Sequence, residues 1–200
     1  MHAIRFFSLF VTLTLLSITT SLVGFDWQSG WEAEVRTAAF RPSSKLFRRI
    51  YGNWEMEYQL EVAKQFNDCS DFYGWSSVGF LDKKGHSIPL RDSTRIMMVP
   101  LNLGIKYVYS LWSCIDVSLG IGGSCNFVNI KNHTHFLRKR TQKTAWGGIV
   151  KSGIRYNFWR SAYLDLFADY TYQHLNFHSS HRKNVDVGGL LLGAGIGLYF

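Results

Sequence analysis

The sequence predicts an all-β chain that folds as an eight-stranded antiparallel up-and-down transmembrane β-barrel. Three observations predict this fold. Stretches of the chain alternate apolar and polar residues with the period of two that strands require. The connections between these stretches are alternately long and short. The chain also closes on an apolar, glycine-spaced stretch, residues 185–200, which would give a strand one apolar face and one nearly bare face.

Composition agrees with a single membrane-embedded β domain. The chain has 200 residues, enough for one domain, with 16% aromatic and 18% charged residues. Ordinary soluble domains carry about 25% charged residues. A helical membrane protein of this length would contain several apolar runs of about 20 residues. This sequence contains one such run, at its N-terminus.

That N-terminal run predicts a secretory signal peptide over residues 1–24. Arg5 precedes an apolar core from Phe6 to Val23, and the small residues Ser21 and Gly24 lie near the expected cleavage point. The alternative is an uncleaved N-terminal anchor. We expect the chain to be exported and residues 25–200 to form the barrel.

The clearest internal strand is NWEMEYQLEV, residues 53–62, where apolar residues alternate with glutamates and a glutamine. Pro100 removes one ladder donor from a later strand, so we expect a bulge there. The eight expected strands span residues 30–40, 53–62, 72–81, 94–109, 115–128, 144–158, 161–174 and 185–200. The long connections cover residues 41–53, 82–93, 129–143 and 175–184, and the short ones residues 67–71, 110–114 and 157–160.

A soluble ligand-binding barrel is apolar inside, whereas a membrane barrel is apolar outside, so alternation alone does not separate them. Three features favour the membrane barrel. Aromatic residues gather at strand ends, as in an interfacial girdle. Glycines gather on the charged face, where a narrow interior needs room for long side chains. The last residue, Phe200, is aromatic.

The charged face of the strands is expected to line the lumen. It carries eight acids and four bases: Glu32, Glu34, Glu55, Glu57, Glu61, Asp116, Asp165, Asp169, Arg36, Lys106, Lys151 and Arg155. We expect these groups to pair in an interior too narrow to conduct, and the alternative is a narrow cation-preferring pore. The residues assigned to this lumen network are Glu34, Glu57, Asp116, Lys151, Arg155 and Asp169.

The end of the chain matches most of a C-terminal assembly signal, polar-x-Gly-x-x-apolar-x-aromatic. Gly195, Leu198 and Phe200 fit this pattern, and Gly193 stands where the pattern has a polar residue. With these residues and the strand plan, the chain resembles the small eight-stranded outer-membrane β-barrel family of the OmpX and OmpA transmembrane-domain type. The resemblance implies residence in the cell outer membrane and recognition by the barrel assembly machinery.

Basic residues are concentrated in the long connections. With Arg95 counted as the residue at a loop edge, these hold fifteen of the 22 lysines and arginines, opposed by Asp82 and Asp92. A solvated loop surface is one explanation. Contact with the phosphates of lipopolysaccharide is the preferred one, and contact with host surface polyanions such as sulfated glycans is second. Export makes nucleic acid an improbable partner. The residues assigned to this lipid or polyanion contact are Arg48, Arg49, Arg138, Lys139, Arg140, Lys143, Arg182 and Lys183.

Catalysis is the third alternative, as a lipid A-modifying outer-membrane enzyme. His178, Ser180 and His181 have the spacing of a base and a nucleophile, but they lie in an expected loop without a nearby acid. We therefore expect no enzyme activity. No cysteine or histidine spacing predicts a metal site or a cofactor, since His133 and His135 are best explained as loop residues.

Three cysteines exclude a disulfide framework. Cys69 and Cys114 both fall in short turns, where an oxidising compartment permits a bridge. Cys125 is expected to face outward as an inert apolar residue.

Overall fold

The structure is a computed structural model that describes residues 30–67, 71–86, 93–133, 138–175 and 185–200. Residues 31–199 form the barrel, and this unit is described by itself. The predicted signal peptide lies outside the described residues. The elements are β1 (Trp31–Pro42), α2 (Lys45–Tyr51), β2 (Glu55–Gln65), β3 (Phe72–His86), β4 (Ser93–Trp112), β5 (Ile115–His133), β6 (Arg138–Trp159), β7 (Ala162–Leu175), β8 (Val185–Asp186) and β9 (Gly189–Tyr199).

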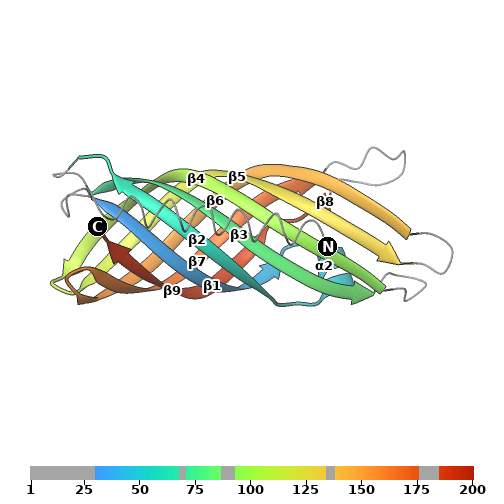
Figure 1. Cartoon of the computed structure of the whole chain (residues 1–200), viewed down its shortest axis with the longest axis horizontal. Coiled ribbons are helices and arrows are strands. Elements are labelled where there is room, and N and C mark those ends of the chain that lie inside the picture. The colour runs from blue at the N-terminus through green and yellow to red at the C-terminus, as the bar shows by residue number, and fades with distance from the viewer. Residues whose placement is uncertain (1–29, 68–70, 87–92, 134–137, 176–184) are drawn as a thin grey trace. The chain divides into compact units, whose positions relative to one another are not determined.

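The strands close into an antiparallel up-and-down barrel (Figure 1). Each of β1 to β7 pairs with the next strand in sequence, and β9 pairs with both β7 and β1. The two-residue β8 also pairs with β7, so β8 and β9 together make the eighth strand. The predicted eight-stranded barrel and its closure between the first and last strands are confirmed. Phe200 lies one residue beyond the end of β9, not within the strand as predicted.

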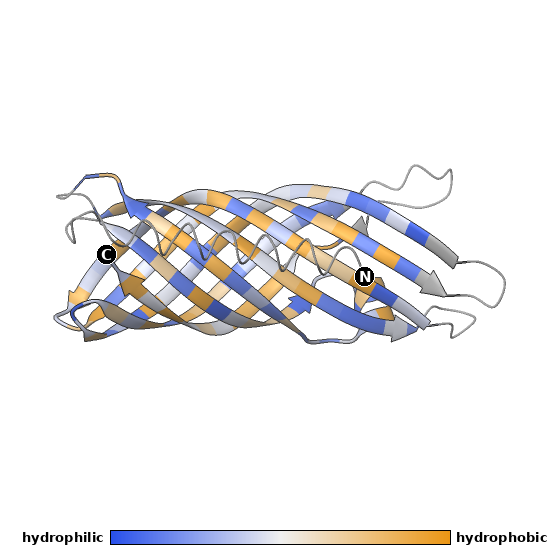
Figure 2. Ribbon diagram, viewed as in Figure 1, coloured by the Kyte–Doolittle hydropathy of each residue, from blue (hydrophilic) through white to orange (hydrophobic). Residues whose placement is uncertain are grey.

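The polarity of the two faces is that of a barrel with an apolar exterior. Along each strand, apolar and polar residues alternate, as Figure 2 shows. The outward side chains of Leu103, Ile121 and Leu166 are 66 to 69% exposed, whereas the inward side chains of Glu61 and Arg155 are buried. A soluble barrel would have the opposite arrangement.

The interior has two levels of different chemistry. Towards the short turns it is filled by charged side chains, which are described below. Towards the long connections it is filled by an apolar cluster, which the sequence did not lead us to expect. The buried members of this cluster are Ala38, Phe40, Phe47, Tyr51, Leu81, Ile96, Met98, Val128, Ala145, Phe167, Val187 and Leu191.

The first long connection contains a helix, where the sequence predicted only a polar loop over residues 41–53. The side chain of Ser44 caps helix α2 by accepting a hydrogen bond from the Phe47 backbone N–H at 3.4 Å. Phe47 and Tyr51, four residues apart and so on one helix face, are buried in the apolar cluster. The Tyr51 hydroxyl lies 3.2 Å from Thr94 Oγ1, and burial raises the pKa of Tyr51.

Helix α2 therefore holds the connection against the apolar end of the lumen instead of leaving it in solvent. Arg48 adds to this by donating a hydrogen bond of 2.8 Å to the carbonyl oxygen of Pro42. Among the described residues, no helix is long and apolar enough to cross a membrane.

Several strands are longer than predicted, and three of them extend by about five residues or more towards the long connections. β3 continues to His86, β5 continues to His133, and β6 begins at Arg138. Within the loops predicted over residues 82–93 and 129–143, residues 82–86, 93, 129–133 and 138–143 are therefore paired strand. The polar composition of these stretches indicated loops. Their backbone groups nevertheless pair across the hairpins, and the hairpins extend past the level of the apolar cluster.

The predicted bulge at Pro100 is wrong. The β3–β4 ladder lacks pairs at Pro100, but its register is the same on both sides, and the shift in β4 lies between Ser110 and Trp112. Gly79 explains how the proline is accommodated, because a Cβ atom there would lie 2.7 Å from Pro100 Cγ. The missing side chain leaves room for the ring, so the strand does not need to bulge.

The packing of α2 predicts a specific stability difference. Replacing Phe47→Ala should lower the free energy of unfolding by about 3 kcal/mol, because a buried aromatic ring is lost from the apolar cluster. Replacing its exposed neighbour Leu46→Ala should change it by about 0.5 kcal/mol or less. Urea unfolding of the refolded protein in detergent measures both. Equal effects of the two substitutions would contradict the packing of this helix.

Candidate functional site

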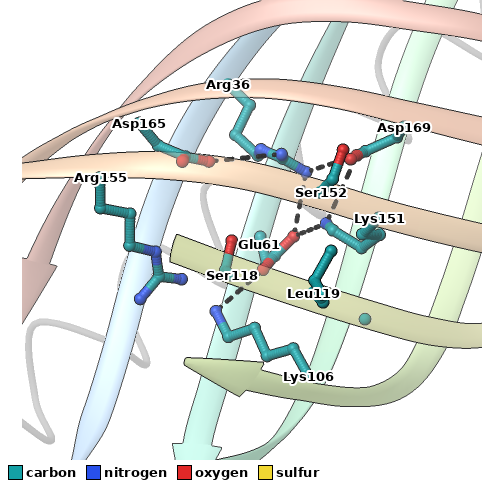
Figure 3. Close-up of a pocket in the computed structure, with 11 residues that line it drawn as sticks. Arg36, Glu61, Lys106, Ser118, Leu119, Lys151, Ser152, Arg155, Asp165 and Asp169 are labelled. Carbon is teal, nitrogen blue, oxygen red and sulfur yellow. Dashed lines mark hydrogen bonds and ion pairs between the residues drawn. The ribbon is translucent and has the colours of Figure 1, made fainter. Parts of the chain in front are cut away.

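The charged level of the lumen is centred on Glu61 of β2, which three cations share (Figure 3). Glu61 Oε2 lies 3.3 Å from Arg36 Nη1 and also contacts Lys151 Nζ, while Oε1 lies 3.2 Å from Lys106 Nζ. The three cations come from β1, β6 and β4, so one carboxylate joins strands from across the barrel. All four side chains are buried.

Arg36 extends this network to β7. Its Nη1 lies 3.0 Å from Asp169 Oδ2, and its Nη2 lies 3.4 Å from Asp165 Oδ2. Its Nε lies 3.2 Å from Glu34 Oε1, and its guanidinium carbon lies 3.5 Å from the centre of the Phe167 ring. The planar group thus contacts carboxylates at its edge and an aromatic ring on its face, which is the geometry that arginine supports best.

Glu32 makes a second branch of the network towards the short turns. It accepts hydrogen bonds from Lys106 Nζ at 2.8 Å and from Arg155 Nη1 at 3.0 Å. Arg155 also lies over the Tyr163 ring, and Lys151 lies over the Trp75 ring at 4.4 Å. The buried cations are therefore held by both carboxylates and aromatic faces.

Four of the six residues assigned to the lumen network from sequence lie in this cluster, and two lie apart. Glu34, Lys151, Arg155 and Asp169 are members. The other two accept hydrogen bonds from neutral amides: Glu57 from Gln59 at 2.8 Å and Asp116 from Asn157 at 2.7 Å.

The sequence assignment omitted the two residues with the most partners. Arg36, Glu61 and Lys106 were all assigned to the lumen face, but none of them was assigned to the network. Alternation tells which face a residue occupies. Which charged side chains form ion pairs depends on their positions along the barrel axis, and these positions are set by the register of the strand pairs.

Little space remains between these side chains. A cavity of about 10 Å³ lies in the network, and a second of similar size lies above it, near Phe40 and Gln173. Each is close to the least volume that holds one water molecule. The lining of the first includes Arg36, Glu61, Lys106, Lys151, Arg155, Asp165 and Asp169 (Figure 3).

Glycines provide the room for the long side chains. A Cβ atom at Gly195 would collide with Glu34, and one at Gly153 would lie 2.7 Å from Asp165 Oδ1. The glycine face of the last strand is thus needed beside Glu34 and Arg36, as predicted. At Gly197 the neighbour is instead the Tyr163 ring.

Six of the eight basic residues assigned to lipid or polyanion contact are described, and they lie on two elements. Arg48 and Arg49 lie on α2, and Arg49 is exposed. Arg140 and Lys143 lie on β6, where Arg140 is exposed and its Nε donates to Asn129 Oδ1 at 3.2 Å. The remaining four are Arg138 and Lys139, which begin β6 opposite His133 and Asn132, and Arg182 and Lys183, which lie outside the described residues.

The long-loop end carries more acid than the sequence indicated. Glu55, assigned to the lumen, begins β2 at this end, and its Oε2 lies 2.7 Å from Lys83 Nζ. Arg95 is paired with Asp82, through a hydrogen bond of 2.7 Å from Nε to Oδ1 and a second contact. Two of the basic residues at this end are therefore neutralised by the protein itself.

The catalytic candidates His178, Ser180 and His181 lie outside the described residues, as do His135 and Cys69. Within the described ranges, no group of three histidine, cysteine, aspartate or glutamate residues is placed to hold a metal ion. Cys114 has a free thiol in this structure, and the Cys69–Cys114 bridge that the sequence permits stays untested, because Cys69 lies outside the described residues. Cys125 faces outward from β5 and is half-buried.

The fold and the lumen together define a class of protein, a closed eight-stranded barrel with a filled ionic interior and an apolar exterior. Comparison with solved structures finds this fold in small outer-membrane barrels. Neisserial surface protein A matches with a TM-score of 0.60 and 18% identity over 86% of this chain and 98% of that one. OprG from Pseudomonas aeruginosa matches with a TM-score of 0.61 and 14% identity over 88% and 99%.

Ail from Yersinia pestis, solved in complex with the heparin analogue sucrose octasulfate, matches with a TM-score of 0.52 and 14% identity over 84% of this chain and 97% of that one. At these identities the likeness is one of fold. No protein-family model matches the sequence, and a search of curated proteins finds no significant match. This chain has the fold of the small eight-stranded outer-membrane β-barrels, as its C-terminal pattern and strand plan predicted.

The arrangement around Glu61 predicts the cost of removing its charge. Glu61→Gln should lower the free energy of unfolding by about 3 to 5 kcal/mol, because three buried cations lose a shared anion. Glu57→Gln is the matched control, since Glu57 is as deeply buried but is hydrogen-bonded to an amide. It should cost about 1 kcal/mol. Unfolding in urea compares the two variants, and a Glu61→Gln cost no larger than the control would contradict the central role of Glu61.

Proposed function

We propose that the chain is an integral outer-membrane protein with a structural and surface-interaction role, and that it has no catalytic activity. Its exterior anchors it in the bilayer, its ionic interior closes the lumen, and its basic long-loop end contacts anions at the cell surface. The observation that carries this proposal is the inverted polarity of the barrel. Arginines, lysines and carboxylates fill one half of the interior, while leucine, isoleucine and aromatic side chains cover the exterior.

The height of the apolar exterior supports a bilayer as its surroundings. Tyr109, opposite Val117, lies near the short turns, and Phe127 lies ten residues further along β5 from Val117. This distance is about 26 Å along the barrel axis at the strand tilt usual for membrane barrels. The apolar band of such barrels is about 25 Å tall. An exposed apolar surface of this extent is not stable in water.

Orientation follows from the connections. In outer-membrane barrels the short turns face the periplasm and the long loops face the outside. The basic long-loop end is therefore proposed to be extracellular, and the Glu61 network lies in the periplasmic half. Entry into the membrane is proposed to use the barrel assembly machinery, through the pattern of Gly195, Leu198 and Phe200.

A closed lumen is favoured over a pore by what fills each level of the interior. The Glu61 network occupies the periplasmic half. One cavity of about 10 Å³ lies within the network, and a second of similar size lies on its extracellular side. The apolar cluster occupies the extracellular half, with Phe47 and Tyr51 of α2 packed into it. An ion would have to displace ion pairs and then cross an apolar level, so neither level favours conduction.

Contact with anions is proposed from the exposed basic residues at the extracellular end. Arg49 on α2 and Arg140 on β6 are exposed, and arginine pairs well with phosphate and sulfate oxygens. Phosphates of lipopolysaccharide are the first candidate, because the barrel wall adjoins the outer leaflet. Sulfated host polyanions are the second, and the Ail complex with a heparin analogue supports such binding by this fold.

The membrane placement predicts an effect that a soluble barrel would not show. Ile121 is 69% exposed and lies midway along the apolar band. Ile121→Arg should lower the free energy of unfolding from vesicles by about 2 to 4 kcal/mol, because the arginine is placed among lipid chains. In water, an exposed site would accept arginine at little cost. Leu46→Arg, on the exposed side of α2, is the control and should be nearly neutral.

The closed lumen predicts no stable conductance steps from the purified protein in planar bilayers. Insertion is verified in the same preparation by heat-modifiable gel mobility and by proteolysis of the extracellular connections from outside. Stable cation-selective steps from inserted protein would overturn the closed lumen and favour the narrow pore. The same recordings on Phe47→Ala would show whether α2 contributes to closure.

A further inference from the structure

The register of the extended strands brings four basic residues into one row. Lys84 of β3 is the cross-strand partner of Arg95 of β4, Arg95 is the partner of Lys131 of β5, and Lys131 is the partner of Arg140 of β6. All four side chains are exposed on the outer wall of the barrel. We call them the basic row. At about 4.8 Å between strands, the row is about 14 Å long.

The protein neutralises only part of this charge. Asp82 pairs with Arg95. Arg140 donates from its Nε to the amide oxygen of Asn129, a neutral group, so this hydrogen bond does not cancel the charge of Arg140. Lys84 and Lys131 make no ion pair within the described ranges. The row therefore keeps about three positive charges. Like charges on directly opposed strand residues are destabilising, so a bound anion would stabilise the row.

The position of the row on the wall indicates what kind of anion can reach it. Lys131 lies four residues beyond Phe127, the outward aromatic residue at the top of the apolar band on β5. Four residues correspond to about 13 Å of strand, or about 10 Å along the axis at the usual tilt. Lipid headgroups extend about 5 to 8 Å beyond the hydrocarbon core on each side. The backbone of the row thus lies just beyond the headgroup layer, and its long side chains face sideways within reach of that layer.

We propose that the basic row is a binding site for the phosphate groups on the headgroups of lipids in the surrounding leaflet. This proposal rests on the membrane placement proposed above and assigns the anion contact to particular residues. Lys84 and Lys131 provide point charges, and Arg140 adds N–H donors in the fork geometry that suits phosphate oxygens. A lipid is favoured over a soluble polyanion because the row lies on the side wall, beside the apolar band, and not on the end of the barrel.

The row differs from the site assigned from sequence. Only Arg140 belongs to both, and the basic residues of α2 lie on another part of the extracellular end. Lys84, Arg95 and Lys131 are far apart in the sequence, in stretches that we expected to be loops or loop edges. Their proximity follows from strand pairing alone.

The test compares three double variants that each remove two positive charges from exposed positions. Lys84→Gln with Lys131→Gln removes charge from the row. Lys45→Gln with Arg49→Gln removes it from α2 at the same end of the barrel, and Lys64→Gln with Arg160→Gln removes it from the short-turn end. Heat-modifiable mobility verifies that each variant is folded.

Binding is measured for the refolded full-length barrel in neutral detergent with four probes. These are lipid A with its phosphates, enzymatically dephosphorylated lipid A, inorganic phosphate and heparin. We expect the row variant to bind phosphorylated lipid A about 10- to 30-fold more weakly, at about 1 kcal/mol for each basic residue. We expect each control variant to lose less than about 3-fold. Dephosphorylated lipid A should bind all proteins weakly and alike.

Several results would overturn the proposal. An equal loss in the α2 variant would mean that binding is spread over the extracellular end, so the row would fail while the proposed anion contact stands. Competition by inorganic phosphate at the concentration of lipid A would indicate a free-anion site. A loss confined to heparin would indicate a glycan surface. No binding of phosphorylated lipid A or heparin by the unaltered protein would reject both the row and the proposed anion contact.

Discussion

Closing eight strands into a ring forces alternate residues of every strand into one narrow interior, and the rest of the structure depends on how that space is filled. Charges buried there must each be paired, because an unpaired buried charge is strongly destabilising. Glu61 meets this condition by joining Arg36, Lys106 and Lys151 from three other strands. Glycines on the last strand leave the volume that these long side chains need. The interior can therefore be ionic while the exterior is apolar, which is the condition for stability in a bilayer.

The half of the interior towards the long connections meets the same constraint in another way. Apolar side chains from the barrel fill it, and Phe47 and Tyr51 of α2 complete the packing. Because α2 packs inward through these two residues, Lys45, Leu46 and Arg49 on its other side are exposed. The element that packs into this end of the lumen thus also presents charge at the surface. Above it, β3 to β6 continue as paired strands, and their outer wall carries the basic row.

The physical roles of charge in this protein separate by environment. In the lumen, cations are buried, paired with carboxylates and stacked on aromatic rings, so they stabilise one arrangement of the strands. On the outer wall, Lys84 and Lys131 are exposed and lack an ion pair within the described ranges, so they remain available to a ligand. The formal charge of +8 therefore does not describe a uniformly basic surface. Its free portion lies at the end of the barrel where lipid headgroups or cell-surface anions are expected.

The sequence by itself determined the strand count, the face that each strand residue occupies and the closure of the last strand on the first, because a period of two is a local property. It did not determine which charges meet. Arg36 and Glu61 lie 25 positions apart in the sequence and pair because of strand register and stagger. Nor did it reveal α2 or the basic row. The helix is stabilised because Phe47 and Tyr51 pack into the apolar cluster of the lumen. The row forms because the register of four strands places its residues opposite one another. Both are decided by contacts between distant segments, which only the tertiary structure creates.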